Sequence, residues 1–276
     1  MQGFGFWSGL DATVEFRPAP AGTGIVFVRR DLPGMPRIRS VIGNRADGPR
    51  RTTLSANGTA VDMVEHILAA LAGLQIDNCM IFVDRAEMPG LDGSSQRFVE
   101  ALLEAGVQTQ HVRRRTLVID RPVRVGTDDI WLLAEPCQFP HCELRYELSY
   151  PDEPAIGDQN FEMVLRPDAF CSQVAAARTF VTRTEAELLR QQGLGRRVNY
   201  SDILVFDEKG PLENSLRYPD ECARHKLLDM LGDFALSGMD ICGRITARRS
   251  GHRLNAELVR QLLAEFGTSS QLKKSA

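Results

Sequence analysis

The spacing of hydrophobic residues switches between a strand period and a helix period several times in the first 106 residues. Alternation in ATVEFRP and GIVFVRR predicts two strands, and Asn57-Gly58 between two extended pieces predicts a hairpin turn. Residues 61–74 (VDMVEHILAALAGL) carry a helical apolar stripe that ends near Gly73. A buried strand (NCMIFVD) and an amphipathic helix (SQRFVEALLEAG) follow. This half is therefore predicted to mix strands and helices.

The second half repeats this order of elements. Strands are predicted at 116–119, 123–125, 130–135, 142–148, 201–208 and 243–249, and helices at 183–194, 218–236 and 253–266. The segments DGSSQRFVEALLEAG and SGHRLNAELVRQLLAEF occupy matching places in the two halves. The polar stretch QTQHVRRR between the halves predicts a boundary that gives domains 1–111 and 112–276. We therefore expect an α+β protein with two similar layers packed together.

Composition excludes several classes of protein. A hydrophobic fraction of 43% and a charged fraction of 25% are ordinary for a globular chain, and a net charge of −3 gives no basic field for nucleic acid. No apolar run approaches the ~20 residues that span a bilayer, so no stable membrane insertion is expected. The six cysteines form no CxxC pair, which favours reduced thiols over disulfides or a thiolate zinc site. We expect a cytoplasmic monomer that acts on a small molecule.

The stretch CARHKLLDMLGD sets His225, Asp229 and Asp233 four residues apart, which places them in one row along a helix. The ordinary explanation of such a row is a solvated face. Solvated faces, however, are usually filled by Lys, Glu, Arg and Gln, which form helices better than His or Asp do. The alternative is a metal site, because a His/Asp pair at this spacing can present a nitrogen and an oxygen to one zinc ion.

Two other histidines have neighbours that suit the same chemistry. His66 would complete a set of three zinc ligands, and the adjacent Glu65 would then take a proton from the attacking water. His252 follows Gly251 in SGHRLN, where Asp233 could hydrogen-bond its ring and raise its pKa for use as a general acid. Taken singly, these are a polar pair on a helix and a capping histidine. Taken together, they supply the parts of a zinc amidase.

Five segments carry a resemblance to a known family: MVEHILAALAGLQIDN, EMPGLDGSSQRFVEAL, AARTF, LRYPDECARHKLLDMLGDFAL and SGHRLN. In this order they resemble the UDP-3-O-acyl-N-acetylglucosamine deacetylases, the zinc enzymes of the committed step in lipid A synthesis. The resemblance implies two βααβ layer-sandwich domains packed face to face, with the active site between them. It also implies that zinc is held by His66, His225 and Asp229.

The remaining roles also follow from the resemblance. Glu65 would be the general base, and His252 would be the cation that protonates the leaving amine, oriented by Asp233. Thr179 in ARTF would donate to the developing oxyanion. Further residues would meet the substrate: Lys226 at the diphosphate, Phe180 near the sugar, and Leu188, Leu189 and Leu194 along the acyl chain in an insert at about 181–206. These leucines are equally compatible with an ordinary core.

Departures from the family leave alternatives open. Trp7 stands where relatives usually carry a histidine near the substrate, and VTRT at 181–184 replaces a more apolar stretch. Relatives also have a strand before the turn that corresponds to residues 3–9. The chain is therefore expected to be the zinc-dependent deacetylase, with a deacetylase of a different acylated amino sugar or a non-catalytic sugar-nucleotide binding protein as alternatives. The choice between Zn²⁺ and Fe²⁺ stays open.

Overall fold

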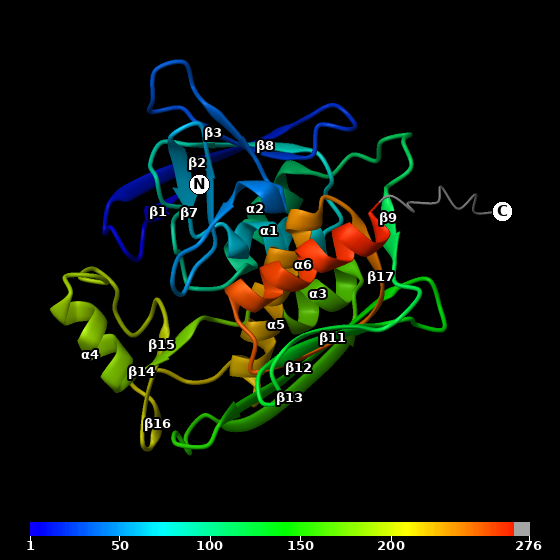
Figure 1. The fold of residues 1–276 in the computed structure, drawn as a ribbon. Coiled ribbons are helices and arrows are strands. Elements are labelled where there is room, and N and C mark those ends of the chain that lie inside the picture. Colours follow the sequence, from blue (N-terminus) through cyan, green and yellow to red (C-terminus); the bar gives the residue numbers. More distant parts are fainter. Residues whose placement is uncertain (268–276) are drawn as a thin grey trace.

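Two large sheets enclose the helices in the computed structural model, which describes residues 1–267 (Figure 1). The first sheet has the strand order β1-β2-β8-β3-β4, in which β3 and β8 are parallel and the other neighbours are antiparallel. Its strands are β1 (Gln2–Phe4), β2 (Asp11–Pro18), β3 (Ile25–Arg29), β4 (Arg37–Arg39) and β8 (Cys79–Val83). The strands predicted from ATVEFRP, GIVFVRR and NCMIFVD are thus present, and the chain has the predicted α+β class.

The predicted Asn57-Gly58 hairpin joins β6 (Thr53–Ala56) to β7 (Thr59–Asp62), and β5 (Arg45–Ala46) completes this small sheet. The helix predicted from residue 61 is shorter, because α1 spans Glu65–Gly73. Residues 59–62 instead form a strand whose residues alternate between buried and half-buried positions. Met63 has a φ of 57°, which is incompatible with a right-handed helix, so the helix begins after it. Helix α2 (Gln96–Ala105) begins and ends close to its predicted limits.

The second sheet is built from strands that follow residue 111. Its order is β10-β11-β17-β12-β13, and β9 pairs with the first part of β17. These strands are β9 (Thr116–Val118), β10 (Val123–Gly126), β11 (Trp131–Glu135), β12 (Cys142–Tyr150), β13 (Gly157–Val164) and β17 (Asp240–Arg248). Strand β13 and the short helix α3 (Pro167–Gln173) were not predicted. The polar GDQN start of β13 obscures the alternation of polar and apolar residues that marks a strand. The domain boundary at residue 111 stays a prediction.

A separate layer projects beside the two sheets in Figure 1. It contains β14 (Phe180–Thr182), α4 (Arg183–Gln191), β15 (Leu204–Asp207) and β16 (Gly210–Pro211). Helix α4 begins with a capping box, in which the Thr182 hydroxyl accepts from the Glu185 amide and the Glu185 carboxylate accepts from the Thr182 amide. No residue of α4 is fully buried, whereas Leu204 and Phe206 of β15 are, so the layer joins the core through its strands and not through its helix.

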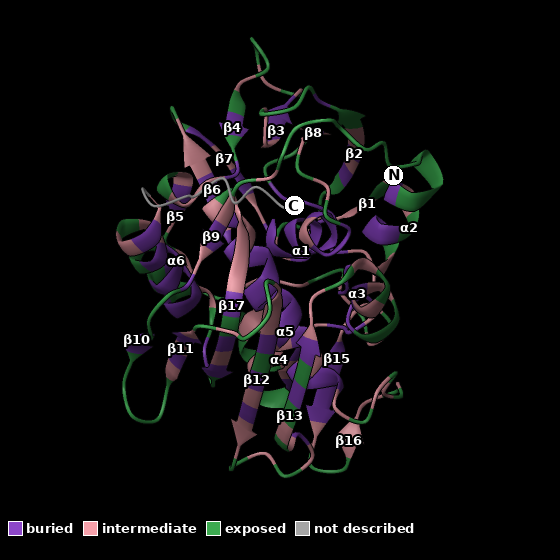
Figure 2. Ribbon diagram, turned by 90° about the vertical axis from the view of Figure 1, so that its right-hand side faces the viewer, coloured by how far each residue is buried: buried purple, intermediate pink, exposed green. Residues whose placement is uncertain are grey.

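The two halves meet where α1 crosses α5 (Glu221–Phe234), and α6 (His252–Phe266) packs beside α5. Both α1 and α5 are buried almost throughout, as Figure 2 shows in purple. The row His225, Asp229 and Asp233 is therefore no solvated face, since each of these residues is at most 4% exposed. Buried ionisable groups need partners, and these are found in the site described below.

The crossing depends on Gly232. A methyl group there would collide with the backbone carbonyl of Glu65, so α5 can approach α1 this closely only at a residue without a side chain. The contact places the first turn of α1, which carries Glu65 and His66, directly against the second half of α5.

We predict that Gly232→Ala forces these two helices apart. Because the obstacle is backbone, the variant should lose about 3 kcal/mol or more of unfolding free energy, at or beyond the usual range for overpacking. Chemical denaturation measures this. Gly43→Ala, which adds the same methyl group where nothing lies within 4 Å, is the matched control. Equal stability of the two variants would contradict the close-approach argument.

Candidate metal centre and active-site cleft

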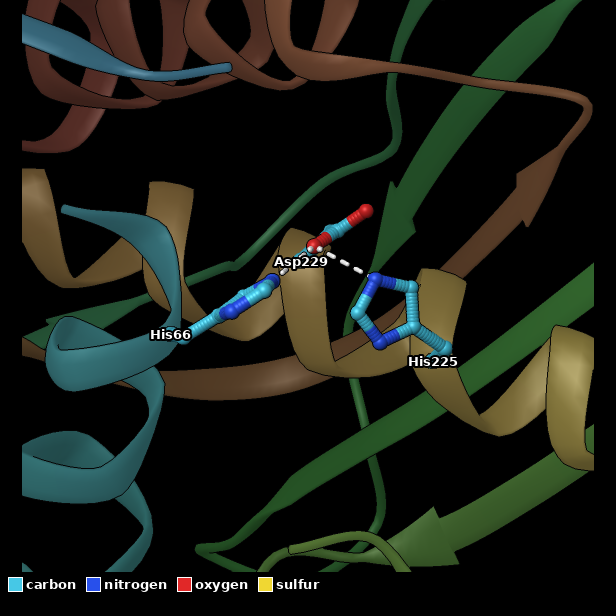
Figure 3. A group of neighbouring side chains, drawn as sticks. All are labelled: His66, His225 and Asp229. Atoms are coloured by element: carbon cyan, nitrogen blue, oxygen red, sulfur yellow. Dashed lines mark ion pairs between the residues drawn. The ribbon is translucent and has the colours of Figure 1, made fainter. Parts of the chain in front are cut away.

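Three potential ligands converge from two helices. His66 lies in the first turn of α1, and His225 and Asp229 are one turn apart on α5 (Figure 3). The Oδ1 atom of Asp229 is 3.6 Å from Nε2 of His66 and 3.4 Å from Nε2 of His225. A tetrahedral ion with bonds near 2.0–2.1 Å separates its ligand atoms by about 3.3 Å. The three side chains therefore fit one ion, and they are the only group of this kind in residues 1–267.

The protonation states also suit a cation. Burial lowers the pKa of His225 to about 3, although the charge of Asp229 opposes this, so the ring is neutral. Its Nδ1 donates to the carbonyl of Ala177 at 3.1 Å, which leaves the lone pair of Nε2 facing Asp229. Burial raises the pKa of Asp229, but its interactions with His225, Lys226 and His66 lower it by more, to well below the ordinary value. An ionised carboxylate and a neutral imidazole are ligand states that divalent metals require.

Glu65 lies beside this group and lines the same cavity as His66. Its Oε2 accepts the backbone N–H of Thr52 at 3.0 Å. Burial raises the pKa of Glu65 above its usual value, and the charges of His252 and His66 partly counter the shift. A carboxylate tuned in this way suits a general base.

His252, which also lines the cavity, forms a dyad with Asp233. The Nδ1 atom of His252 is 2.9 Å from Oδ2 of Asp233, and Asn255 donates to the same oxygen at 2.8 Å. Burial lowers the pKa of His252, but the charge and hydrogen bond of Asp233 outweigh it, with help from Asp229 and Glu65, and raise it to about 9. The ring is thus a cation at neutral pH, as the sequence predicted for a general acid.

A cavity of about 740 Å³ joins these groups to the projecting layer. Thr179 and Phe180 line it beside Lys226, whose Nζ lies 5.7 Å from the Phe180 ring centre. Leu189 and Leu194 also line the cavity. Leu188 does not: it is 52% exposed, because neighbouring helix residues point about 100° apart and Leu189 takes the inward side. The expectation that all three leucines face the acyl chain is corrected for Leu188.

Contacts between the two halves form part of the lining of this cavity. Arg50, from the loop before β6, forms an ion pair of 2.9 Å with Glu185 on α4, and both residues line the cavity. Trp7 forms part of the wall, and the guanidinium of Arg51 lies 4.6 Å from its ring centre. The residue that departs from the family pattern is therefore part of the cleft.

A second cavity of about 600 Å³ adjoins the first and shares Lys226 and Tyr150 with it. Arg249 lines this second cavity, so two cationic side chains face it. The Nζ atom of Lys226 also donates to Oδ2 of Asp229 at 3.0 Å, which ties it to the ligand group. Sequence reasoning missed Tyr150 and Arg249. Arg249 directly precedes the SGH motif, which was the available signal.

A buried His/His/Asp group beside a carboxylate of raised pKa and a charged histidine is typical of metal-dependent hydrolases. The family model for UDP-3-O-acyl N-acetylglycosamine deacetylase matches residues 1–264. The chain is 40% identical over 267 residues to the UDP-3-O-acyl-N-acetylglucosamine deacetylase of Anaeromyxobacter sp. (strain Fw109-5), covering 96% of this chain and 86% of that protein. The proteins of the same name from Myxococcus xanthus and Psychrobacter arcticus are 37% and 40% identical, with 96% and 95% of this chain and 84% and 82% of theirs covered. The chain belongs to this deacetylase family.

We predict that the purified protein binds one divalent ion and that His66→Ala and His225→Ala lose it. Each change removes one of three ligands and leaves too few to hold the ion against a chelator. Elemental analysis after dialysis measures the bound metal. His111→Ala, at an exposed histidine, should keep the ion. Full metal content in both ligand variants would show that the ion sits elsewhere.

Proposed function

We propose that the chain hydrolyses the acetamide of a UDP-3-O-acyl-N-acetylglucosamine and releases acetate and the free amine, as the committed step of lipid A synthesis. The observation that carries this proposal is the convergence of the His66–His225–Asp229 group, Glu65 and the His252–Asp233 dyad on one cavity. The names of the relatives add the substrate class.

The metal is proposed to be Zn²⁺, because two imidazoles and one carboxylate at tetrahedral spacing are a typical catalytic zinc set. When bound, the ion supplies Lewis-acid polarisation of the amide carbonyl and lowers the pKa of a water molecule. His66, His225 and Asp229 are proposed as its ligands. Their burial excludes bulk water, and the hydrogen bond from His225 to Ala177 keeps one ring in the required tautomer.

The chain's own residues then move the protons. Glu65 accepts a proton from the water that attacks the amide carbon, and the hydroxyl of Thr179 donates a hydrogen bond to the amide oxygen as it gains charge. His252 gives its proton to the nitrogen as the C–N bond breaks, so the amine leaves neutral. Asp233 keeps His252 charged until that step.

The substrate is proposed to occupy both cavities. Phe180 packs near the sugar, and the acyl chain extends along Leu189 and Leu194 in the larger cavity. Lys226 and Arg249 meet the diphosphate, since cationic side chains of both kinds bind phosphate. Trp7 is the wall residue at which a different acylated amino sugar would be selected.

We place the reaction in the cytoplasm and assign it to a monomer. All proposed ligands and proton-transfer groups come from one chain, so no second copy is needed to complete the site. Every cysteine is a free thiol, as expected in a reducing compartment. Within residues 1–267, none of the helices has the length and apolar character needed to cross a membrane.

We predict acetate release from the UDP substrate, loss of release with a chelator, and recovery on adding Zn²⁺. Glu65→Gln should lower kcat by about 100- to 10,000-fold while zinc stays bound, because only the proton acceptor is removed. Glu104→Gln, at an exposed position of α2, is the matched control. Equal inertness of wild type and Glu65→Gln would favour a sugar-nucleotide binding protein. Faster turnover of another acylated amino sugar would favour the other deacetylase.

A bell-shaped pH profile of kcat/KM is also expected. Activity should rise as Glu65 ionises above its ordinary pKa and fall as His252 loses its proton near pH 9. Asp233→Asn removes the charge that raises the pKa of His252, so the basic limb should move down by roughly one pH unit or more. Initial rates across pH, with zinc content checked at each end, test this. A basic limb unmoved by Asp233→Asn would exclude His252 as the acid.

A further inference from the structure

Thr52 touches both proton-transfer groups of the proposed site, yet its neighbours in the sequence give no sign of this. The residue is fully buried and lies just before β6, in the first half of the chain. Its contacts reach the three helices that carry the site: α1, α5 and α6.

The backbone of Thr52 is fixed against the start of α1. Its N–H donates to Oε2 of Glu65 at 3.0 Å, and its carbonyl accepts the N–H of Val64 at 3.2 Å. Two backbone hydrogen bonds on the same short segment leave little freedom for the position of its Cα atom. The direction of the side chain is therefore set by the helix that carries the proposed base.

The side chain of Thr52 points to the acid dyad. Its hydroxyl donates to Oδ1 of Asp233 at 2.5 Å and lies 3.3 Å from Nδ1 of His252. The other carboxylate oxygen, Oδ2, receives His252 and Asn255. Both oxygens of Asp233 are thus engaged, and the hydroxyl that reaches Oδ1 comes from the first half of the chain. Rotation of the carboxylate would break at least one of these bonds.

We propose that Thr52 is a positioning residue for the proton donor: its hydroxyl holds the Asp233 carboxylate so that Oδ2 faces His252, and it draws charge away from that oxygen. This inference rests on the proposed function, in which His252 protonates the leaving amine. Thr52 also fixes the proton donor, His252, relative to the proton acceptor, Glu65, because its backbone N–H binds Glu65 while its hydroxyl binds Asp233.

The charge balance around His252 explains why a neutral hydroxyl matters. The ring is faced by the carboxylates of Asp233 and Asp229 on α5 and of Glu65 on α1. Together these hold the proton on the ring. A donor on Oδ1 weakens the pull of Asp233, so the ring stays charged but gives up its proton more readily. Without the hydroxyl, His252 should bind its proton more tightly and transfer it more slowly.

The test compares Thr52→Val, which keeps the shape and removes the hydroxyl, with Thr52→Ser, which keeps the hydroxyl. Thr52→Val should lower kcat by about 10- to 100-fold with KM nearly unchanged, and should move the basic limb of the pH profile upward by about half a unit or more. Thr52→Ser should recover most of the lost kcat. Thr53→Val is the matched control, since the Thr53 hydroxyl donates to Asp62 at 2.6 Å and, within residues 1–267, forms no hydrogen bond to Asp233 or His252.

A direct titration keeps this inference separable from the proposed function. NMR of the full-length protein gives the imidazole pKa of His252, assigned with His252→Ala, whether or not the enzyme turns over. A raised pKa in Thr52→Val but not in Thr53→Val supports the role of Thr52. Should Thr52→Val fail to fold, Thr52→Ala removes the same hydroxyl with less bulk.

Two results would overturn the inference: an unchanged His252 pKa in the variant without the hydroxyl, or equal losses of kcat in Thr52→Val and Thr52→Ser. Absence of acetate release by wild type would instead count against the proposed function.

Discussion

The close crossing of α1 and α5 at Gly232 is the constraint on which the site depends. It sets the backbone of Glu65 against α5, so Glu65 and His66 lie beside side chains that are remote in the sequence. The distances of 3.4 and 3.6 Å from Asp229 to the two histidines require this approach, because His66 extends from one helix and His225 and Asp229 from the second. A side chain at position 232 would push α1 away from α5. This one displacement would lower both the stability of the fold and the affinity for a metal ion.

Such a crossing buries several ionisable groups, which is unfavourable unless each finds a partner. Asp233 has three donors, and Asp229 has Lys226 and the two ligand histidines. These pairings fix the geometry before any substrate binds, so little reorganisation remains for the reaction itself. The buried polar groups thus lower the activation free energy of the reaction, and they do so at some expense in the free energy of unfolding.

Local patterns allowed part of this to be predicted. The row on α5 could be found because its members lie four residues apart on one helix. The pairing with His66 was inferred from the three protein ligands that catalytic zinc takes, and the family resemblance implied the same set. The start of α1 was misplaced because Val61 and Val64 continue an apolar pattern through a strand and a turn. Thr52 could not be found, since its role comes from contacts to Asp233 and His252, which are 181 and 200 residues away.

His225 and His252 show how partners, and not burial alone, decide the protonation state of a histidine. Burial disfavours the charged form of both rings. For His225 it prevails and lowers the pKa to about 3, since Lys226 and His66 lie near its single carboxylate partner. For His252 the carboxylates of Asp233, Asp229 and Glu65 prevail and raise the pKa to about 9. Two largely buried imidazoles are thereby held in opposite states, one able to donate a lone pair to a metal and the other able to donate a proton. The number of carboxylates around each ring therefore decides whether the ring is neutral or charged.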